Sequence, residues 1–237
     1  MLIKCKPKRG FNMSKNATVS QLTAEFLGST ILVMTAVSPV ILFTYVMEAS
    51  SSITMFANAI AVAFVLCALI EIFGPISGAH FNPVVTMAML LDRKINTAKA
   101  AMYVLVQFAG GIVGLVLSKL MFLDEVGNLF AVSDTVRNQH VFFGEIFGTF
   151  ILILAIMLLV QARSQKSSII VGLLVGGLAM STSSTMFANP QVTVARMLTN
   201  TPSGIRPVDG LVFIAMQIIG TLLAYGVYKL VFKCATP

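Results

Sequence analysis

Six long apolar runs constrain the fold of this chain more than any other feature of its sequence. A helix needs about 20 mostly apolar residues to cross the hydrocarbon core of a bilayer. The runs predict spanning helices over Leu22–Val46, Ile53–Phe73, Ala98–Phe122, Val141–Gln161, Ser168–Ser184 and Val208–Phe232. Only 11% of the residues are charged, against about 25% in a soluble domain, which is too few to cover a surface in water. The sequence therefore predicts an all-α integral membrane protein and excludes a soluble enzyme.

Basic residues are distributed unequally between the two sides of the membrane. With both termini in the cytoplasm, twelve of the sixteen lysines and arginines face the cytoplasm, whereas the opposite orientation inverts the ratio. Residues 1–20 then form a basic cytoplasmic tail, and residues 123–140 form an acidic extracellular connecting loop. We interpret the net charge of +7 as orientation and contact with lipid headgroups rather than nucleic-acid binding. The predicted location is the plasma (inner) membrane.

The sequence indicates neither a catalytic site nor a metal site. The three cysteines, Cys5, Cys67 and Cys234, have no C-x-x-C spacing, so neither a zinc site nor a disulfide framework is predicted. The two histidines, His80 and His140, lie in different segments, and no nucleophile–base pair accompanies them. We expect no cofactor, no metal and no enzymatic activity.

The chain repeats itself internally. Three matches occur in the same order in both halves: 24–32 with 144–152, Asn82–Thr86 with Asn189–Thr193, and Gln107 and Gly110 with Gln217 and Gly220. Residues 21–122 form the first repeat and residues 141–237 the second, each with three spans. An odd number of spans requires the second repeat to enter the membrane inverted, and in such proteins the site lies where the repeats meet. The glutamines are expected to bond across helices and the glycines to allow close approach.

Each repeat contains an Asn-Pro pair that predicts a short helix. Asparagine is a good N-cap and proline suits the first helical position, so residues 83–91 and 190–198 are expected to be helical. Nine residues at about 1.5 Å each reach roughly half of a ~30 Å hydrocarbon core. Neither helix can span the membrane, so each enters from its own face and stops at the midplane. The inversion then brings the N-terminal ends of the two half-helices together.

That meeting point suits the passage of neutral solutes. Each helix N-terminus carries about half a positive charge, so two of them aimed at one point repel a cation. The amides of Asn82 and Asn189 can donate hydrogen bonds to a passing oxygen. The non-helical stretch before each half-helix exposes backbone carbonyls, which are tolerated only where they line a watery cavity. Such a path admits hydroxylated neutral molecules and opposes cations and protons.

These segments resemble the signatures of the aquaporin and glycerol-facilitator family, the major intrinsic proteins. Ser77–Thr86 reads Ser-Gly-Ala-His-Phe-Asn-Pro-Val-Val-Thr and closely matches the family's Ser-Gly-Ala-His-Leu-Asn-Pro-Ala-Val-Thr. The resemblance extends over residues 22–232. It implies a right-handed, inverted-repeat bundle of six spanning helices and two re-entrant half-helices, with one pore per subunit and a homotetramer. It also implies that Glu25 and Glu145 brace the two pore loops and that His80 lines the pore.

The chain departs from the family at both pore signatures. The third signature residue is usually alanine, but Val84 follows Asn82 and Pro83, and Gln191 follows Asn189 and Pro190. Both side chains are larger than alanine and change the packing at the midplane. Gln191 also adds a polar group there.

The second departure concerns the selectivity filter. The arginine that usually follows the second signature is replaced by Val192, and the nearest arginine is Arg196, one helical turn further along. Family spacing places the filter at four residues that have no aromatic ring, no histidine and no charge: Val62, Gly177, Met186 and Val192. Arg196 either caps carbonyls of the half-helix or stands at the mouth as a displaced filter cation.

A wide apolar filter favours glycerol, urea or neutral metalloid hydroxides such as arsenous acid (arsenite) over strict water selectivity. The segment Asn189–Arg196, followed by Gly204–Pro207, is similar to a bacterial branch associated with arsenic genes. We therefore interpret the chain as a passive channel for water and small neutral solutes. Two alternatives stay open: a strict water channel with Arg196 as the displaced filter residue, and a non-conducting membrane scaffold.

Overall fold

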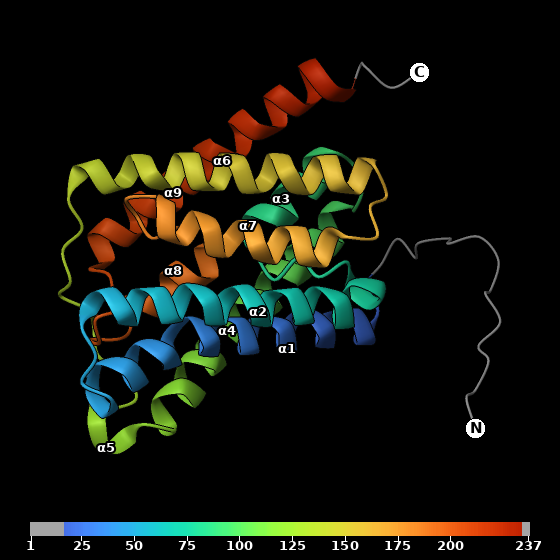
Figure 1. Ribbon diagram of the computed structural model, residues 1–237. Coiled ribbons are helices and arrows are strands. Elements are labelled where there is room, and N and C mark those ends of the chain that lie inside the picture. The colour runs from blue at the N-terminus through green and yellow to red at the C-terminus, as the bar shows by residue number, and fades with distance from the viewer. Residues whose placement is uncertain (1–16, 234–237) are drawn as a thin grey trace.

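The computed structural model describes residues 17–233, a bundle of helices (Figure 1). Its main helices are α1 (Val19–Ile41), α2 (Ser51–Ser77), α4 (Thr97–Leu120), α6 (Gln139–Gln161), α7 (Ser167–Ser181) and α9 (Pro207–Val227). The short helices are α3 (Pro83–Leu91), α5 (Leu123–Val126) and α8 (Pro190–Met197). Two π-helical segments, η1 (Leu42–Val46) and η2 (Tyr228–Phe232), continue α1 and α9. Residues 1–16 of the predicted basic tail lie outside the described residues.

Within the described residues, five helices are long and apolar enough to cross a membrane when η1 and η2 are counted with α1 and α9. The sixth predicted span, α7, is apolar but has only 15 residues. Its predicted end at Ser184 is wrong, because the backbone is already extended at Thr182 and leads into the loop before α8. The predicted all-α membrane fold is confirmed.

The two half-helices begin where the Asn-Pro pairs predict. Asn82 Oδ1 accepts a hydrogen bond from Val84 N at 3.0 Å, and Asn189 Oδ1 accepts one from Gln191 N at 3.2 Å. Each asparagine therefore caps its own helix. The proline that follows it occupies the first helical position, where no backbone N–H is needed. Helix α3 covers the predicted residues, and α8 ends at Met197, one residue early.

Glycines set how closely the main helices pack. Helix α1 packs against α4 and α2, α6 against α9, and α2 against α7. A Cβ atom on Gly110 of α4 would collide with the carbonyl oxygen of Phe26 in α1. The repeat-equivalent Gly220 of α9 faces α6, where a Cβ atom would lie 2.6 Å from Ile146 O. The same close crossing therefore occurs in both repeats, as the internal repeat predicts.

The polarity of the bundle is that of a membrane protein. Large apolar side chains such as Phe64 of α2 and Leu173 of α7 are more than half exposed, which suits contact with lipid. Polar side chains are buried instead, and Glu25 and Glu145 have no exposed surface. Figure 1 shows α3 and α8 among the longer helices, which enclose them. The polar interior therefore lies around the two half-helices.

Candidate functional site

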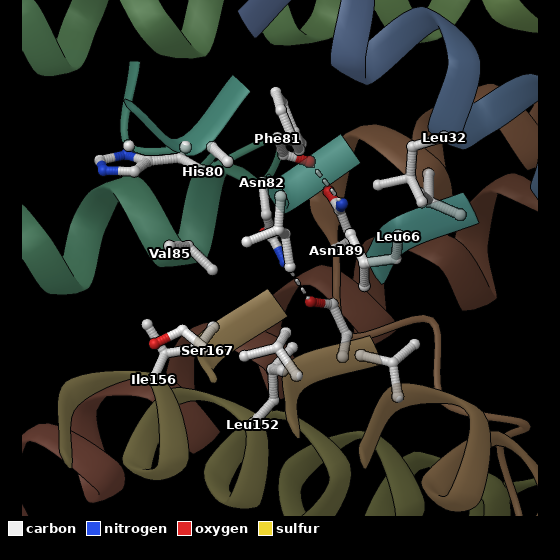
Figure 2. A pocket seen from close by; sticks show the side chains of 18 of the residues that line it. Leu32, Leu66, His80, Phe81, Asn82, Val85, Leu152, Ile156, Ser167 and Asn189 are labelled. Carbon is white, nitrogen blue, oxygen red and sulfur yellow. Dashed lines mark hydrogen bonds between the residues drawn. The ribbon is translucent and has the colours of Figure 1, made fainter. Parts of the chain in front are cut away.

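The two half-helices meet at a pair of asparagines. Asn82 Nδ2 donates to Ala188 O at 2.8 Å, and Asn189 Nδ2 donates to Phe81 O at 2.9 Å (Figure 2). Each asparagine thus caps its own helix with its oxygen and holds the opposite loop with its nitrogen. An amide nitrogen carries two donor hydrogens, so each side chain keeps one donor beyond this contact. The N-terminal ends of α3 and α8 are joined directly at this point.

Glu25 holds the loop before α3. Its Oε1 accepts from Ser77 Oγ at 2.6 Å and His80 N at 3.0 Å. Its Oε2 accepts from Phe81 N and from Gln107 Nε2, both at 2.8 Å. All of these donors converge on one buried carboxylate, which satisfies backbone groups that the loop cannot pair internally.

Glu145 holds the loop before α8 in the same way. It accepts from Phe187 N at 2.8 Å, Ala188 N at 2.9 Å and Gln217 Nε2 at 2.7 Å. Ala188 has a positive φ of 45°, matched by a φ of 45° at Phe81 in the other loop. Side-chain-bearing residues rarely adopt this conformation, so the carboxylates stabilise strained loops whose amides point inward.

A continuous cavity of about 410 Å³ passes the asparagine pair. Its inner end, where α1 begins, is lined by residues that include Gln21, Lys94, Lys99 and Ser167. Its outer end, near residues 123–140, is lined by Asn58, Val192 and Arg196 among others. Between them the wall is mostly apolar, with Leu32, Leu66, Leu152 and Ile156 around the asparagines (Figure 2).

His80 lines the inner half of this cavity. Its Nδ1 shares a hydrogen bond of 3.0 Å with Thr86 Oγ1. The single hydroxyl proton of Thr86 is already donated to Asn82 O, so His80 Nδ1 must be the donor in this pair. The imidazole therefore keeps Nε2 as an acceptor.

The structure places three of the four predicted filter residues on the cavity wall. Val62, Met186 and Val192 line it, whereas Gly177 is absent from its described lining. Val192 is 6% exposed and packs in a cluster with Val33 and Leu115. The wall at this level is apolar, and Asn58, one turn before Val62 on α2, adds a polar group further out.

The two enlarged signature residues point away from the cavity. Val84 packs in an apolar cluster with Ile153 and Met157 of α6. Gln191 is buried, and its Nε2 donates to Phe81 O, the same carbonyl that Asn189 contacts. Gln191 thus adds a polar group at the midplane, as expected, but as a second clamp on the opposite loop and not as part of the cavity wall.

Arg196 lies at the outer end of the cavity, and only 6% of its surface is exposed. Its Nη2 donates to Ala36 O of α1 at 2.7 Å, and its guanidinium carbon lies 4.3 Å from the centroid of the Phe187 ring. The expectation that it caps carbonyls of its own half-helix is wrong, because its acceptor belongs to α1. A guanidinium has five donor hydrogens, and among the described residues Arg196 has one acceptor, Ala36 O. Arg196 therefore keeps donors that can act in the cavity it lines.

The connecting loop folds over the outer end, which the sequence did not predict. Ser133 N donates to Met197 O at 2.9 Å, so the loop pairs with the end of α8. Arg137 N then donates to Asp209 Oδ2 at 2.8 Å, and its guanidinium lies 5.6 Å from the Phe187 ring. Burial lowers the pKa of Arg137, while the Glu145 and Asp209 carboxylates oppose that shift. Two guanidinium groups therefore share one aromatic ring at this end.

No group of three histidine, cysteine or acidic side chains that could hold a metal occurs in residues 17–233. The sequence did predict the asparagines, glutamates and histidine that the structure brings together. It missed Lys99, Asn58, Phe187 and Arg137. Repeat spacing offers a signal for Lys99, because it precedes Gln107 by the same eight residues that separate Asp209 from Gln217.

Comparisons with known proteins agree with these features. The model of the major intrinsic protein family matches residues 12–188. Aquaglyceroporin AqpS of Rhizobium meliloti (strain 1021) is 34% identical over 219 residues, which cover 90% of this chain and 91% of the relative. The glycerol uptake facilitator protein of Streptococcus pneumoniae (strain ATCC BAA-255 / R6) is 29% identical over 178 residues, or 69% of this chain and 75% of the relative. The X-ray structure of the aquaglyceroporin from Plasmodium falciparum has the same fold, with a TM-score of 0.73 at 18% identity over 90% of this chain and 96% of that one.

Proposed function

This chain belongs to the major intrinsic protein family, and from that premise we propose that it forms a passive channel for water and small neutral solutes. The family consists of membrane channels and not of enzymes. The observation that carries the proposal is the cavity of about 410 Å³ that passes both Asn82 and Asn189 without a carboxylate among its described lining residues.

The asparagine pair supplies the contacts that a hydroxylated solute needs. Asn82 and Asn189 each keep an amide donor, and the half-helix N-termini behind them contribute partial positive charge. A neutral oxygen can therefore accept a hydrogen bond from either amide, whereas the positive ends of the two half-helices repel a cation. The apolar wall around the pair offers few competing partners, so solutes pass without strong binding.

The filter favours solutes larger than water. Val62, Met186 and Val192 contribute apolar side chains to the outer half of the cavity, and Gly177 contributes no side chain. We propose glycerol, urea and neutral metalloid hydroxides such as arsenous acid as substrates alongside water. The relatives named as an aquaglyceroporin and as a glycerol uptake facilitator support glycerol.

A strict water channel is the second candidate, and Arg196 is the observation that favours it. This guanidinium lines the cavity, is anchored to Ala36 O and has donors left over. Placed one turn beyond Val192, it narrows the outer end and offers hydrogen bonds to single water molecules. A non-conducting scaffold would instead fold and assemble without any flux.

We further propose a homotetramer in the plasma (inner) membrane with both termini in the cytoplasm. The exposed apolar side chains of α2 and α7 suit contact with lipid and with other subunits. In this orientation twelve of the sixteen lysines and arginines face the cytoplasm, which supports it. Mass measurement of the protein in lipid nanodiscs tests the assembly, and thiol labelling from one side of sealed vesicles tests the orientation.

The decisive experiment is stopped-flow light scattering of proteoliposomes in parallel gradients of water, glycerol, urea and arsenite. We expect all four permeabilities to exceed those of protein-free liposomes. Water flux without glycerol flux would favour the strict water channel. The absence of any protein-dependent flux would leave only the scaffold.

A further inference from the structure

One lysine is buried in the wall of the cavity. The sequence alone identifies it only as one of the basic residues that set the orientation in the membrane. Lys99 lies in the first turn of α4 and is 3% exposed. It lines the inner end of the cavity together with Gln21, His80 and Ser167. A lysine is rarely buried this completely without a partner, so its surroundings decide what the charge does.

An aromatic ring holds the ammonium in place. Lys99 Nζ lies 5.2 Å from the centroid of the Tyr103 ring, one helical turn along α4. Tyr103 is fully buried, and its hydroxyl donates to Ser77 O at 2.8 Å, which fixes the ring. The ring also meets the His80 imidazole edge to face at 5.2 Å. The contact between cation and ring positions the charge beside the pore-lining histidine.

The nearby carboxylate does not bind this ammonium. Glu25 already accepts from Ser77, His80, Phe81 and Gln107, so both of its oxygens are occupied. Throughout the described part of the chain, Lys99 Nζ has neither a hydrogen-bond acceptor nor an ion-pair partner. Its three donor hydrogens are therefore available to the cavity.

The cavity wall itself holds no counter-charge to Lys99, although the Glu25 carboxylate behind the wall attracts the ammonium from beyond ion-pair distance. Lys94, Lys99 and Arg196 carry positive charge among the described lining residues, and no lining residue there carries negative charge. The Lys94 side chain is 52% exposed and lies 4.0 Å from the Asp92 carboxylate, so water and that carboxylate screen it. Arg196 lies at the outer end of the cavity. Among the described lining residues, Lys99 is therefore the buried positive charge at the inner end.

We propose that Lys99 is a specificity-determining residue that gives the inner end of the channel its barrier to cations. Its ammonium repels sodium and hydronium ions before they reach the asparagine pair, while its donors contact the oxygens of neutral solutes. This inference rests on the proposed channel function. It adds a third electrostatic barrier, separate from the half-helix N-termini and from Arg196.

The test compares wild type with Lys99→Met, Lys99→Arg and Arg93→Met in proteoliposomes. Internal dyes report proton and sodium flux under a potassium–valinomycin potential, and stopped-flow scattering reports water and glycerol permeability. We expect Lys99→Met to raise cation flux at least about tenfold and to change water permeability by less than about twofold, because a unit charge near the path acts through an effective dielectric of about 20. Lys99→Arg, which keeps the charge, and Arg93→Met, which removes an exposed charge outside the described cavity lining, should match wild type.

Unchanged cation flux in Lys99→Met at wild-type water permeability overturns the proposal, and so does an equal rise of cation flux in Arg93→Met. A wild-type protein that passes neither water nor glycerol overturns the proposed function itself, and this inference with it. The two failures are therefore distinguishable in one set of measurements.

A charge-restoring experiment separates this role from a purely structural one, in which Lys99 only balances buried Glu25. Lys99→Cys is made in a chain whose Cys5, Cys67 and Cys234 are replaced by serine, and it is modified after reconstitution. Aminoethyl methanethiosulfonate adds an ammonium, and the sulfonatoethyl reagent adds a negative charge; mass spectrometry verifies both adducts. We expect the first to lower cation flux to the parent level and the second to raise it. Equal cation flux after both reagents overturns the proposal.

Discussion

At the scale of single residues, each pore asparagine serves two half-helices at once. Asn189 caps α8 through Oδ1 and holds Phe81 O through Nδ2 at 2.9 Å. We expect Asn189→Asp to keep the cap but to lose the donor, because a carboxylate only accepts. Neutral-solute flux should fall by roughly tenfold, the equivalent of one hydrogen bond of about 1.4 kcal/mol. Cation flux should rise, because the new charge lies where two helix N-termini converge.

Glycerol swelling assays and a sodium dye in the same proteoliposomes measure both effects of Asn189→Asp. Asn82→Asp is the matched variant in the other repeat, where Asn82 Nδ2 donates to Ala188 O at 2.8 Å. Unchanged solute selectivity in a well-folded Asn189→Asp protein would argue that this pair is not at the centre of the path.

The outer filter provides a second test at this scale. Val192 lines the cavity one turn before Arg196. We expect Val192→Arg to lower glycerol permeability several-fold more than water permeability, because a larger solute loses clearance while water gains donors. If Arg196 already acts as the filter cation, Val192→Arg crowds two charges and silences the protein, and Arg196→Ala widens selectivity.

Glycerol-to-water permeability ratios of wild type, Val192→Arg and Arg196→Ala at matched expression distinguish these outcomes. A wild-type protein that passes water but no glycerol, and whose ratio changes only in Arg196→Ala, would contradict the apolar filter at Val62, Met186 and Val192.

At the scale of helices, close crossing depends on particular glycines. A methyl group at Gly220 of α9 would lie 2.6 Å from Ile146 O of α6. We expect Gly220→Ala to destabilise the protein by about 1–3 kcal/mol through overpacking. Gly226→Ala, in the same helix, is the control, because a methyl group there would meet no atom within 4 Å. Thermal unfolding in detergent checks the difference, and equal effects of both substitutions would show that the α6–α9 crossing is looser than described.

The loop braces act at the same scale. Glu145 accepts two backbone hydrogen bonds and one from Gln217, all at 2.7–2.9 Å. We expect Glu145→Gln to cost about 1–3 kcal/mol, because an amide has one acceptor oxygen and leaves a buried donor without a partner. Glu25→Gln should have a similar effect in the other repeat. Glu71→Gln is the control, because Glu71 is exposed and, among residues 17–233, accepts a hydrogen bond from Ser168 Oγ alone.

Thermal unfolding and solute flux are measured together for these variants. Both brace variants should lose flux along with stability, because the loop amides that position Asn82 and Asn189 are released. A Glu145→Gln protein that behaves like Glu71→Gln in both measurements would remove the bracing role.

At the scale of the whole molecule, the sequence predicted the features that follow from its apolar runs and its internal repeat, namely the helical membrane fold and the two opposed half-helices. Both half-helix starts follow from the Asn-Pro pairs. The repeat places Glu25 and Glu145 at equivalent positions, and the family resemblance implied that both brace the pore loops. The directions in which individual side chains point could not be predicted from the repeat or the apolar runs. Gln191 turns toward α4 because Gly111 leaves room there, with its Oε1 3.4 Å from a Cβ placed on that glycine. Arg137 reaches Phe187 only because the connecting loop folds inward, and no periodicity describes such a loop.

The arrangement of charge over the whole conduit predicts passive, non-ionic transport. Lys99 stands at the inner end, Arg196 at the outer end and two helix N-termini at the centre, with no carboxylate among the described lining residues. A cation therefore meets repulsion at three successive points, and the neutral asparagines at the centre cannot carry a proton through coupled titration. We expect solute flux that rises linearly with the gradient, does not depend on a pH difference, and carries no sodium or potassium current in a planar bilayer. Saturating, pH-driven uptake would instead indicate a coupled transporter, and a protein-dependent sodium current would show that the positive charges do not face the path.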